Sequence, residues 1–407
     1  MANRRLVVYL FAFIAFFSLG IYLDKIARSW GGAFLGRVPG YARCDRPGEP
    51  VGGDFTLFYS ASALARSGPP EAVYDFPRLR ETEQRLFGPS VALPWPYPPV
   101  FLLLVLPLAL LPYLSSLALW LLTTLAAYLL VVRRTLPHPL TLWLTLAFPG
   151  TFVNFLCGQN GFLSAALVGG GLLRLERCPR AAGVLLGLMS YKPHLAVLLP
   201  VALLAGRRWQ TLRWAALTAL GLAALSAAVF GFGVWQSFFR HIFFSVQMLQ
   251  ESGAPWSKMP SFYAAVQQLG GSFLLSALAQ GLAMAAGLAA VVWLWGRAPG
   301  SPPANAALVL GALMFPPHVF NYDLALLALP LAWLARDGSA RGFLPWEPAL
   351  LILAWGMPLL YVPLEGDLLH IPLGPGLLAL LLGASVWRYF AAGRLTPGAA
   401  SDGGPGF

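Results

Sequence analysis

Long apolar runs alternate with short basic or Gly- and Pro-rich segments along most of the chain. The longer runs reach the roughly 20 residues that a helix needs to cross the hydrocarbon core of a bilayer. Because a spanning segment must satisfy its own backbone hydrogen bonds, each run predicts a helix. The pattern predicts about twelve transmembrane helices, at residues 6–24, 98–132, 140–156, 160–175, 181–191, 193–206, 211–232, 271–295, 303–317, 320–335, 346–362 and 371–388.

Composition supports this prediction. Hydrophobic residues make up 58% of the 407 positions, charged residues only 11%, and the mean hydropathy is +0.68. The sequence therefore predicts an all-α polytopic membrane protein. The net charge of +11 does not indicate a nucleic-acid partner, because most Lys and Arg residues fall in short clusters between apolar runs. We expect the protein to be a monomer in the lipid bilayer.

The basic clusters also predict the orientation, since Lys and Arg are enriched in cytoplasmic loops. The arginines before the first run place the N-terminus inside, and that run lacks a cleavage site, which favours a retained helix over a signal peptide. Segment 98–132 is long enough for two short helices. Pro107 and Pro112 favour a bent or interfacial first half, and one net crossing keeps the charge pattern.

The domain organisation follows from these spans. We predict one membrane domain over residues 1–394, with a long first extracytoplasmic loop at 25–97 that carries short amphipathic helices, and a second outer loop at 233–270. The Gly- and Pro-rich residues 395–407 predict a disordered cytoplasmic tail. No internal repeat is evident.

The three cysteines, Cys44, Cys157 and Cys178, have neither a C-x-x-C nor a metal-binding spacing. A disulfide between Cys44 and Cys157 outside the membrane and unpaired thiols are both open alternatives. No cluster of carboxylates has metal-ligand spacing either, so the sequence predicts a site without metal or cofactor.

Three polar segments interrupt the apolar pattern: CGQNGF (157–162), YKPH (191–194) and PPHVFNYD (316–323). The predicted topology places all three at outer helix ends. Ionisable groups at membrane depth cost about 2.5–3.5 kcal/mol each on insertion scales, so they usually face a cavity or a partner. The three segments are therefore candidates for one outward-facing site.

Five stretches occur in the order GGDFTLFYSASALARSGPPEAVYD (52–75), YPPVFLLLVLPLALLP (97–112), GQNGFL (158–163), GVLLGLMSYKPHLAVLLP (183–200) and FPPHVFNYDLALLALPL (315–331). Together they resemble glycosyltransferase family 87, over nearly the whole chain. The resemblance implies a GT-C fold and inverting transfer of a hexosyl group, mannosyl above all, from a polyprenyl-phosphate sugar outside the cytoplasmic membrane. It also implies a catalytic acidic residue early in the first outer loop, a position that Asp54 matches.

Such a transfer needs a base for the acceptor hydroxyl proton and positive charge near the departing phosphate. Asp54 is the candidate base; the alternative is that Asp54 caps the helix beginning at Phe55. Lys192 is a candidate for binding the donor phosphate, with Pro193 breaking the helix beside it; the alternative is that Lys192 snorkels to the interface. His194 could donate to the same phosphate or cap a local turn.

Further candidates for substrate binding lie in the other polar segments. His318 could bond the phosphate or the sugar. Asp323 could orient His318 or pair with Lys192. Gln159 and Asn160 could bond sugar hydroxyls or simply begin a helix. Tyr322 completes this set.

The second outer loop adds Arg240 and His241, on an apolar stretch (238–250) with helical periodicity. This stretch predicts a helix at the membrane surface that either guides the lipid chain and its phosphate or only anchors the protein. Trp95 and Tyr97 fit an aromatic interface belt. The predicted partners are the polyprenyl-phosphate sugar and a lipid or glycan acceptor, and the alternative function is a multi-pass transporter or flippase of a lipid-linked or anionic substrate.

Overall fold

A computed structural model describes residues 11, 13–24, 43–44, 49–89, 91–251, 255–362 and 372–391, of which 43–44, 49 and 243–251 are described by their backbone alone. This part of the chain is helical apart from one antiparallel pair of two-residue strands, β1 (Arg43–Cys44) and β2 (Glu49–Pro50). The predicted helical class is confirmed. The predicted tail and the side chain of Cys44 lie outside the described residues.

Three helices are long and apolar enough to cross a membrane: α5 (Tyr113–Thr135), α12 (Trp209–Phe230) and α15 (Phe273–Arg297). Six shorter apolar helical segments accompany them: Phe13–Asp24, Pro99–Leu110, Gly161–Arg174, Pro193–Ala205, Pro302–Met314 and Glu347–Tyr361. Helices thus occur in every predicted span, but the twelve crossings are not confirmed and stay a prediction. Breaks divide several of the apolar runs into pieces that are each too short to span the bilayer.

Prolines account for some of these breaks, because a proline lacks the N–H that would continue the helix. In the predicted span 98–132, α4 (Pro99–Val105) and η2 (Leu108–Leu110) precede α5, which begins directly after Pro112. The predicted bend in the first half of this span is therefore confirmed. Span 140–156 is likewise divided, into α6 (Thr141–Leu146) and α7 (Pro149–Cys157).

The centre of the core is formed by helices that are buried on nearly every face. All residues of α16 (Pro302–Met314) from Pro303 onward are buried, and α8 (Gly161–Arg174) and η5 (Asn321–Leu327) are nearly as enclosed. Around them lie α9 (Pro179–Gly187), η3 (Leu188–Tyr191), α10 (Pro193–Ala196), α11 (Leu198–Ala205) and α17 (Ala328–Arg341). A helix that is hydrophobic all round belongs in an interior, as observed.

The first loop folds into α2 (Phe55–Ser67), η1 (Pro70–Tyr74) and α3 (Phe76–Phe87). The aromatic rings of α2 pack inward; Phe55 and Phe58 are fully buried. Glu83 of α3 is also buried, and its Oε2 accepts a hydrogen bond of 2.8 Å from the N–H of Leu93. Burial raises the pKa of this carboxyl to about 7.

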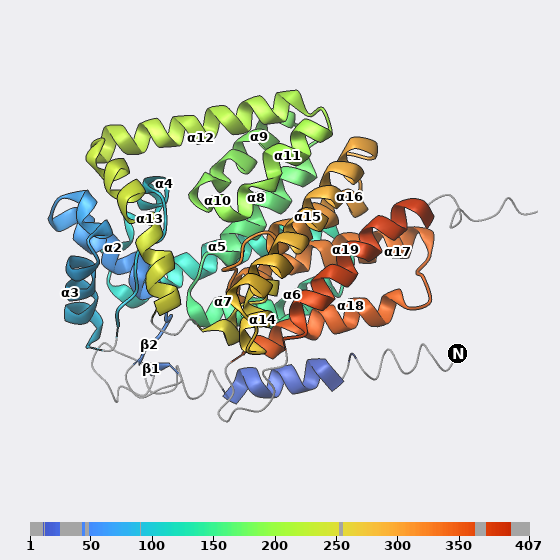
Figure 1. The fold of residues 1–407 in the computed structure, drawn as a ribbon, viewed down its shortest axis with the longest axis horizontal. Coiled ribbons are helices and arrows are strands. Elements are labelled where there is room, and N and C mark those ends of the chain that lie inside the picture. The colour runs from blue at the N-terminus through green and yellow to red at the C-terminus, as the bar shows by residue number, and fades with distance from the viewer. Residues whose placement is uncertain are drawn as a thin grey trace, which may run out of the picture.

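The remaining elements enclose the core. Helix α12 runs along one edge, and α13 (Gly233–Glu251) turns back from its end beside α2 and α3, as Figure 1 shows. The second loop continues through η4 (Trp256–Lys258) and α14 (Phe262–Gln268). The described part of the chain closes with α18 (Glu347–Gly356), η6 (Met357–Tyr361) and α19 (Gly374–Ala391). The helix predicted at 238–250 is confirmed as part of α13, and its position at the membrane surface stays a prediction.

Candidate active site

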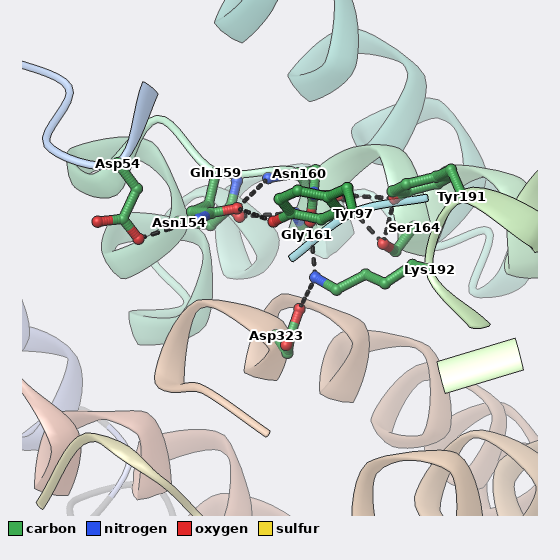
Figure 2. A network of polar contacts seen from close by, with 10 residues as sticks. All are labelled: Asp54, Tyr97, Asn154, Gln159, Asn160, Gly161, Ser164, Tyr191, Lys192 and Asp323. Carbon is green, nitrogen blue, oxygen red and sulfur yellow. Dashed lines mark hydrogen bonds and ion pairs between the residues drawn. The ribbon is translucent and has the colours of Figure 1, made fainter. Parts of the chain in front are cut away.

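Four chain segments meet at one polar cluster inside the helical core. Asp54 precedes α2, Gln159 and Asn160 join α7 to α8, Lys192 lies between η3 and α10, and Asp323 belongs to η5. Figure 2 shows these side chains joined by hydrogen bonds and one ion pair. The structure therefore brings together the polar segments that the sequence analysis singled out.

Two glycines position the backbone at Asp54. Gly158 ends α7 in the left-handed conformation, with φ of +64°, and a Cβ there would lie 2.7 Å from the carbonyl oxygen of Gly52. Gly52 itself has φ of +82°, and a Cβ on it would lie 2.7 Å from the Leu117 side chain. Only glycine accommodates both the positive φ and the close approach. The turn before α2 is thus held directly against the turn between α7 and α8.

The Asp54 carboxylate bonds to another segment and not to its own helix. Asp54 occupies the N-cap position of α2, but its side chain makes no capping hydrogen bond. Its Oδ2 accepts instead from Nε2 of Gln159, at 3.0 Å. The alternative in which this carboxylate caps α2 is therefore wrong, and Asp54 is available for another role.

The surroundings of Asp54 raise its pKa above the ordinary value for aspartate. Burial is the main cause, because it disfavours the charged form. The hydrogen bond from Gln159 and the charges of Lys258 and Lys192 act in the opposite direction. Asp54 as a whole residue is nevertheless only half-buried. A desolvated carboxylate with a raised pKa, on a residue that is not fully enclosed, has the properties of a general base.

Gln159 and Asn160 connect Asp54 to Lys192. The amide oxygen of Gln159 accepts from the Tyr97 hydroxyl at 3.3 Å and from the Asn160 N–H at 3.2 Å. The Asn160 side-chain oxygen then accepts from the Lys192 ammonium at 2.6 Å. Both residues are buried. Both thus do more than begin α8.

Lys192 is 2% exposed, and its ammonium lies 2.5 Å from Oδ1 of Asp323. The alternative in which Lys192 snorkels to the interface is therefore wrong. Of the two roles considered for Asp323, pairing with Lys192 is the one observed. The ring of Tyr322 lies 5.3 Å from the same ammonium. The helix break predicted at Pro193 is confirmed, since η3 ends at Tyr191 and α10 begins at Pro193.

Several residues of this cluster escaped the sequence analysis. Tyr191 and Ser164 share a hydrogen bond of 2.6 Å, and the hydroxyl that accepts it can donate its own proton to the backbone carbonyl of Asn160. Tyr97 and Trp95 are buried rather than placed in an interface belt, which corrects that prediction. One local feature of the sequence pointed to this position. Tyr97 is followed by two prolines, which favour an extended segment over a helix here, and this segment enters the core.

His194 and His318 stay outside the hydrogen-bonded network. His194 is exposed on α10. His318 lies in the turn between α16 and η5, about 6 Å from the rings of Trp256 and Tyr263. Its Nε2 is buried and has no hydrogen-bond partner within the described part of the chain. Burial lowers the pKa of His318, which favours the neutral imidazole.

Lys258 is a cation that the sequence analysis missed. It ends η4 in the second loop, is exposed, and lies close enough to Asp54 for its charge to lower that residue's pKa. The same element carries Trp256, the ring beside His318. A lone lysine in a polar loop gives no sequence signal, because only the fold brings η4 to the first loop.

Arg240 and His241 lie elsewhere, on the exposed side of α13. His241 lines a groove of about 540 Å³ between α13 and the η1–α3 region, together with Glu71, Asp75 and Arg78. The structure does not bring this pair into the Asp54 cluster. Its role in binding the donor phosphate stays a prediction.

Within the described residues, no group of three or more His, Cys, Asp or Glu side chains could hold a metal ion. The absence of a metal requirement stays a prediction of the sequence analysis.

Comparison with known proteins gave one family. The model of glycosyltransferase family 87 matches residues 95–320, more than half of the chain. This range includes Gln159, Asn160, Lys192 and His318, whereas Asp54 precedes it and Asp323 follows it closely. No curated protein and no solved structure matches.

Proposed function

Because the chain belongs to glycosyltransferase family 87, and so is a membrane glycosyltransferase, we propose that it transfers a hexosyl group from a polyprenyl-phosphate sugar to an acceptor hydroxyl. The acceptor is a lipid or a glycan, the reaction takes place on the extracytoplasmic face of the cell membrane, and the anomeric configuration is inverted. Mannose is the proposed sugar. These specifics rest on the resemblance described above and on the charges of the site.

The observation that carries the proposal is the position of Asp54. The residue is half-buried, and its carboxylate makes no cap, has a raised pKa, and is joined through Gln159 and Asn160 to a buried ammonium. One site thus offers both a proton acceptor and positive charge, which are the two groups that glycosyl transfer from a phosphate requires.

In the proposed step the acceptor oxygen attacks the anomeric carbon from the side opposite the phosphate. The new C–O bond forms as the bond between the anomeric carbon and the phosphate oxygen breaks, and polyprenyl phosphate leaves with the electron pair. Asp54 takes the hydroxyl proton. The raised pKa strengthens Asp54 as a base, because a base is most effective when its pKa lies near the working pH.

Three groups are proposed to hold the departing phosphate. A lysine ammonium has three N–H donors, and those of Lys192 serve Asn160 and Asp323, which leaves one for a phosphate oxygen. The buried Nε2 of His318 provides a further contact. Exposed Lys258 adds a positive charge near Asp54.

The test uses purified protein in nanodiscs and a panel of polyprenyl-phosphate sugars, with release of polyprenyl phosphate as the readout. We expect Asp54→Asn to lower turnover by about 10²- to 10⁴-fold while the protein stays folded. Asp75→Asn is the matched control, since Asp75 caps α3 in the same loop and asparagine also caps helices. Donor consumption that survives in Asp54→Asn would remove Asp54 from catalysis. No consumption of any donor would favour the transporter or flippase alternative.

A further inference from the structure

An apolar groove of about 180 Å³ lies between helices of the bundle, and none of its lining residues belongs to α13. Its walls come from α5, α6, α17 and α18, and from the first helix, whose Phe11 ring lies 5.1 Å from that of Trp355. In a membrane protein such a groove faces hydrocarbon. A void at this depth would lose the dispersion contacts that an occupant supplies.

The few polar groups along the groove are already satisfied. The hydroxyl of Thr141 donates to the carbonyl of Leu136, and the hydroxyl of Thr145 donates to the carbonyl of Thr141. The indole N–H of Trp355 donates to the carbonyl of Leu144. A ligand therefore meets no free donor or acceptor on these three side chains, and the chemistry of the groove suits a hydrocarbon chain.

One end of the groove is basic. Ala335 and Leu136 line it, and their chain neighbours Arg336 and Thr135 are joined by a hydrogen bond of 3.4 Å from the guanidinium to the carbonyl. Arg133 and Arg134 occupy the last turn of α5 at the same end. Among the described residues, none of these three arginines forms an ion pair with a carboxylate.

We propose that this groove binds one anionic phospholipid of the bilayer, with an acyl chain between α5, α17 and α18 and its phosphate at Arg336. Unpaired arginines beside a hydrocarbon groove complement a negatively charged headgroup. The positive-inside pattern predicts this end on the cytoplasmic side, where anionic lipids are enriched. The polyprenyl donor is a weaker match, because its phosphate is proposed to bind at the opposite end of α17, near Asp323.

The experiment measures the lipids that stay bound to the purified full chain by native mass spectrometry, after incubation with equal amounts of palmitoyl-oleoyl phosphatidylglycerol and phosphatidylcholine. We expect one phosphatidylglycerol to be retained in preference. Arg336→Gln should weaken its retention about fivefold, the factor that one surface arginine contributes. Ala335→Leu, which fills the groove, should reduce the retention of both lipids.

Arg297→Gln is the matched control, since Arg297 is also an exposed arginine at a helix end but lies on α15, away from the groove. Its variant should bind lipid as the wild type does. A second measurement uses phosphatidylglycerol with brominated acyl chains, which should quench the fluorescence of Trp355, identified by subtracting the signal of Trp355→Phe.

Three results would overturn the proposal: equal retention of the two phospholipids, loss of retention in Arg297→Gln as great as in Arg336→Gln, or quenching of Trp355 by brominated polyprenyl phosphate but not by the brominated phospholipid. The last result would assign the groove to the donor's own chain.

Discussion

The ammonium of Lys192 lies 2.5 Å from a carboxylate oxygen of Asp323, a residue 131 positions further along the chain. Both side chains are 2% exposed. The pair joins the break between η3 and α10 to η5, two places where regular α-helix is interrupted. Because removing two charges from water is costly, such a pair persists only with further hydrogen bonds, which Asn160 supplies here.

The Lys192–Asp323 pair should show strong energetic coupling. Lys192→Met and Asp323→Asn should each destabilise the protein by about 3–5 kcal/mol, since each leaves an uncompensated buried group. The double variant should lose much less than the sum of the two. Thermal unfolding of the four proteins in detergent measures this cycle. Additive losses would show that the two residues act independently.

Gln159 should set the pH dependence of turnover. Its hydrogen bond lowers the pKa of Asp54, so Gln159→Leu should raise that pKa. A base works only when deprotonated, and activity falls as pH drops through its pKa. The acid limb of the pH–rate profile should therefore move to higher pH in Gln159→Leu. Gln84→Leu, on α3, should leave the limb in place. An unchanged limb in Gln159→Leu would separate Gln159 from the base.

Lys258 and Arg240 offer a comparison between two cations of the second loop. Lys258 acts on Asp54 through its charge, whereas Arg240 lies exposed on α13. Lys258→Gln should raise the KM for the donor by about tenfold, the effect of one phosphate contact of about 1.4 kcal/mol, and should also shift the acid limb to higher pH. Arg240→Gln should leave the acid limb unchanged. Equal shifts of the acid limb in both variants would indicate that the total positive charge of the second loop acts on Asp54 over a long range, and not Lys258 through a local contact.

Glu83 should make stability depend on pH. Its pKa of about 7 in the folded protein exceeds that of an exposed glutamate, so the folded state holds the proton more tightly. Stability should fall as pH rises from about 4.5 to about 7, by about 3 kcal/mol, and then level off. Glu83→Gln should remove this dependence, and Glu81→Gln, an exposed neighbour, should not. The measurement is the melting temperature from pH 4 to pH 8. A similar slope in Glu83→Gln would assign the titration to another group.

Sequence reasoning identified most of the residues that meet at Asp54. Polar residues in apolar runs are costly, so Lys192, Asp323 and the Gln159–Asn160 pair were visible as interruptions of the pattern. Which of them touch was not visible. Asp323 had two candidate partners, and only the packing of η5 against α7 and α8 selects Lys192.

Tyr97 and Lys258 show why the rest could not be predicted. An aromatic ring beside apolar runs looks the same whether it faces the interface or the core, and tertiary packing alone decides. Lys258 approaches Asp54 only because α13 turns back and returns the second loop to the first. The number of membrane crossings could not be predicted either. Hydropathy measures the length of an apolar run, but it does not show where breaks divide that run into separate helices.

The contact between Gly52 and Gly158 has a consequence for engineering this enzyme. The two backbones are in contact there, so the position of Asp54 relative to α7 and α8 is fixed by two residues without side chains. The exposed positions of α3, such as Arg80, Glu81 and Arg85, can then be exchanged without moving Asp54, whereas Tyr74 and Glu83 are buried and must be kept. Changing the exposed side of α3 is thus a route to altered acceptor choice, provided that both glycines and the buried residues of this segment are retained.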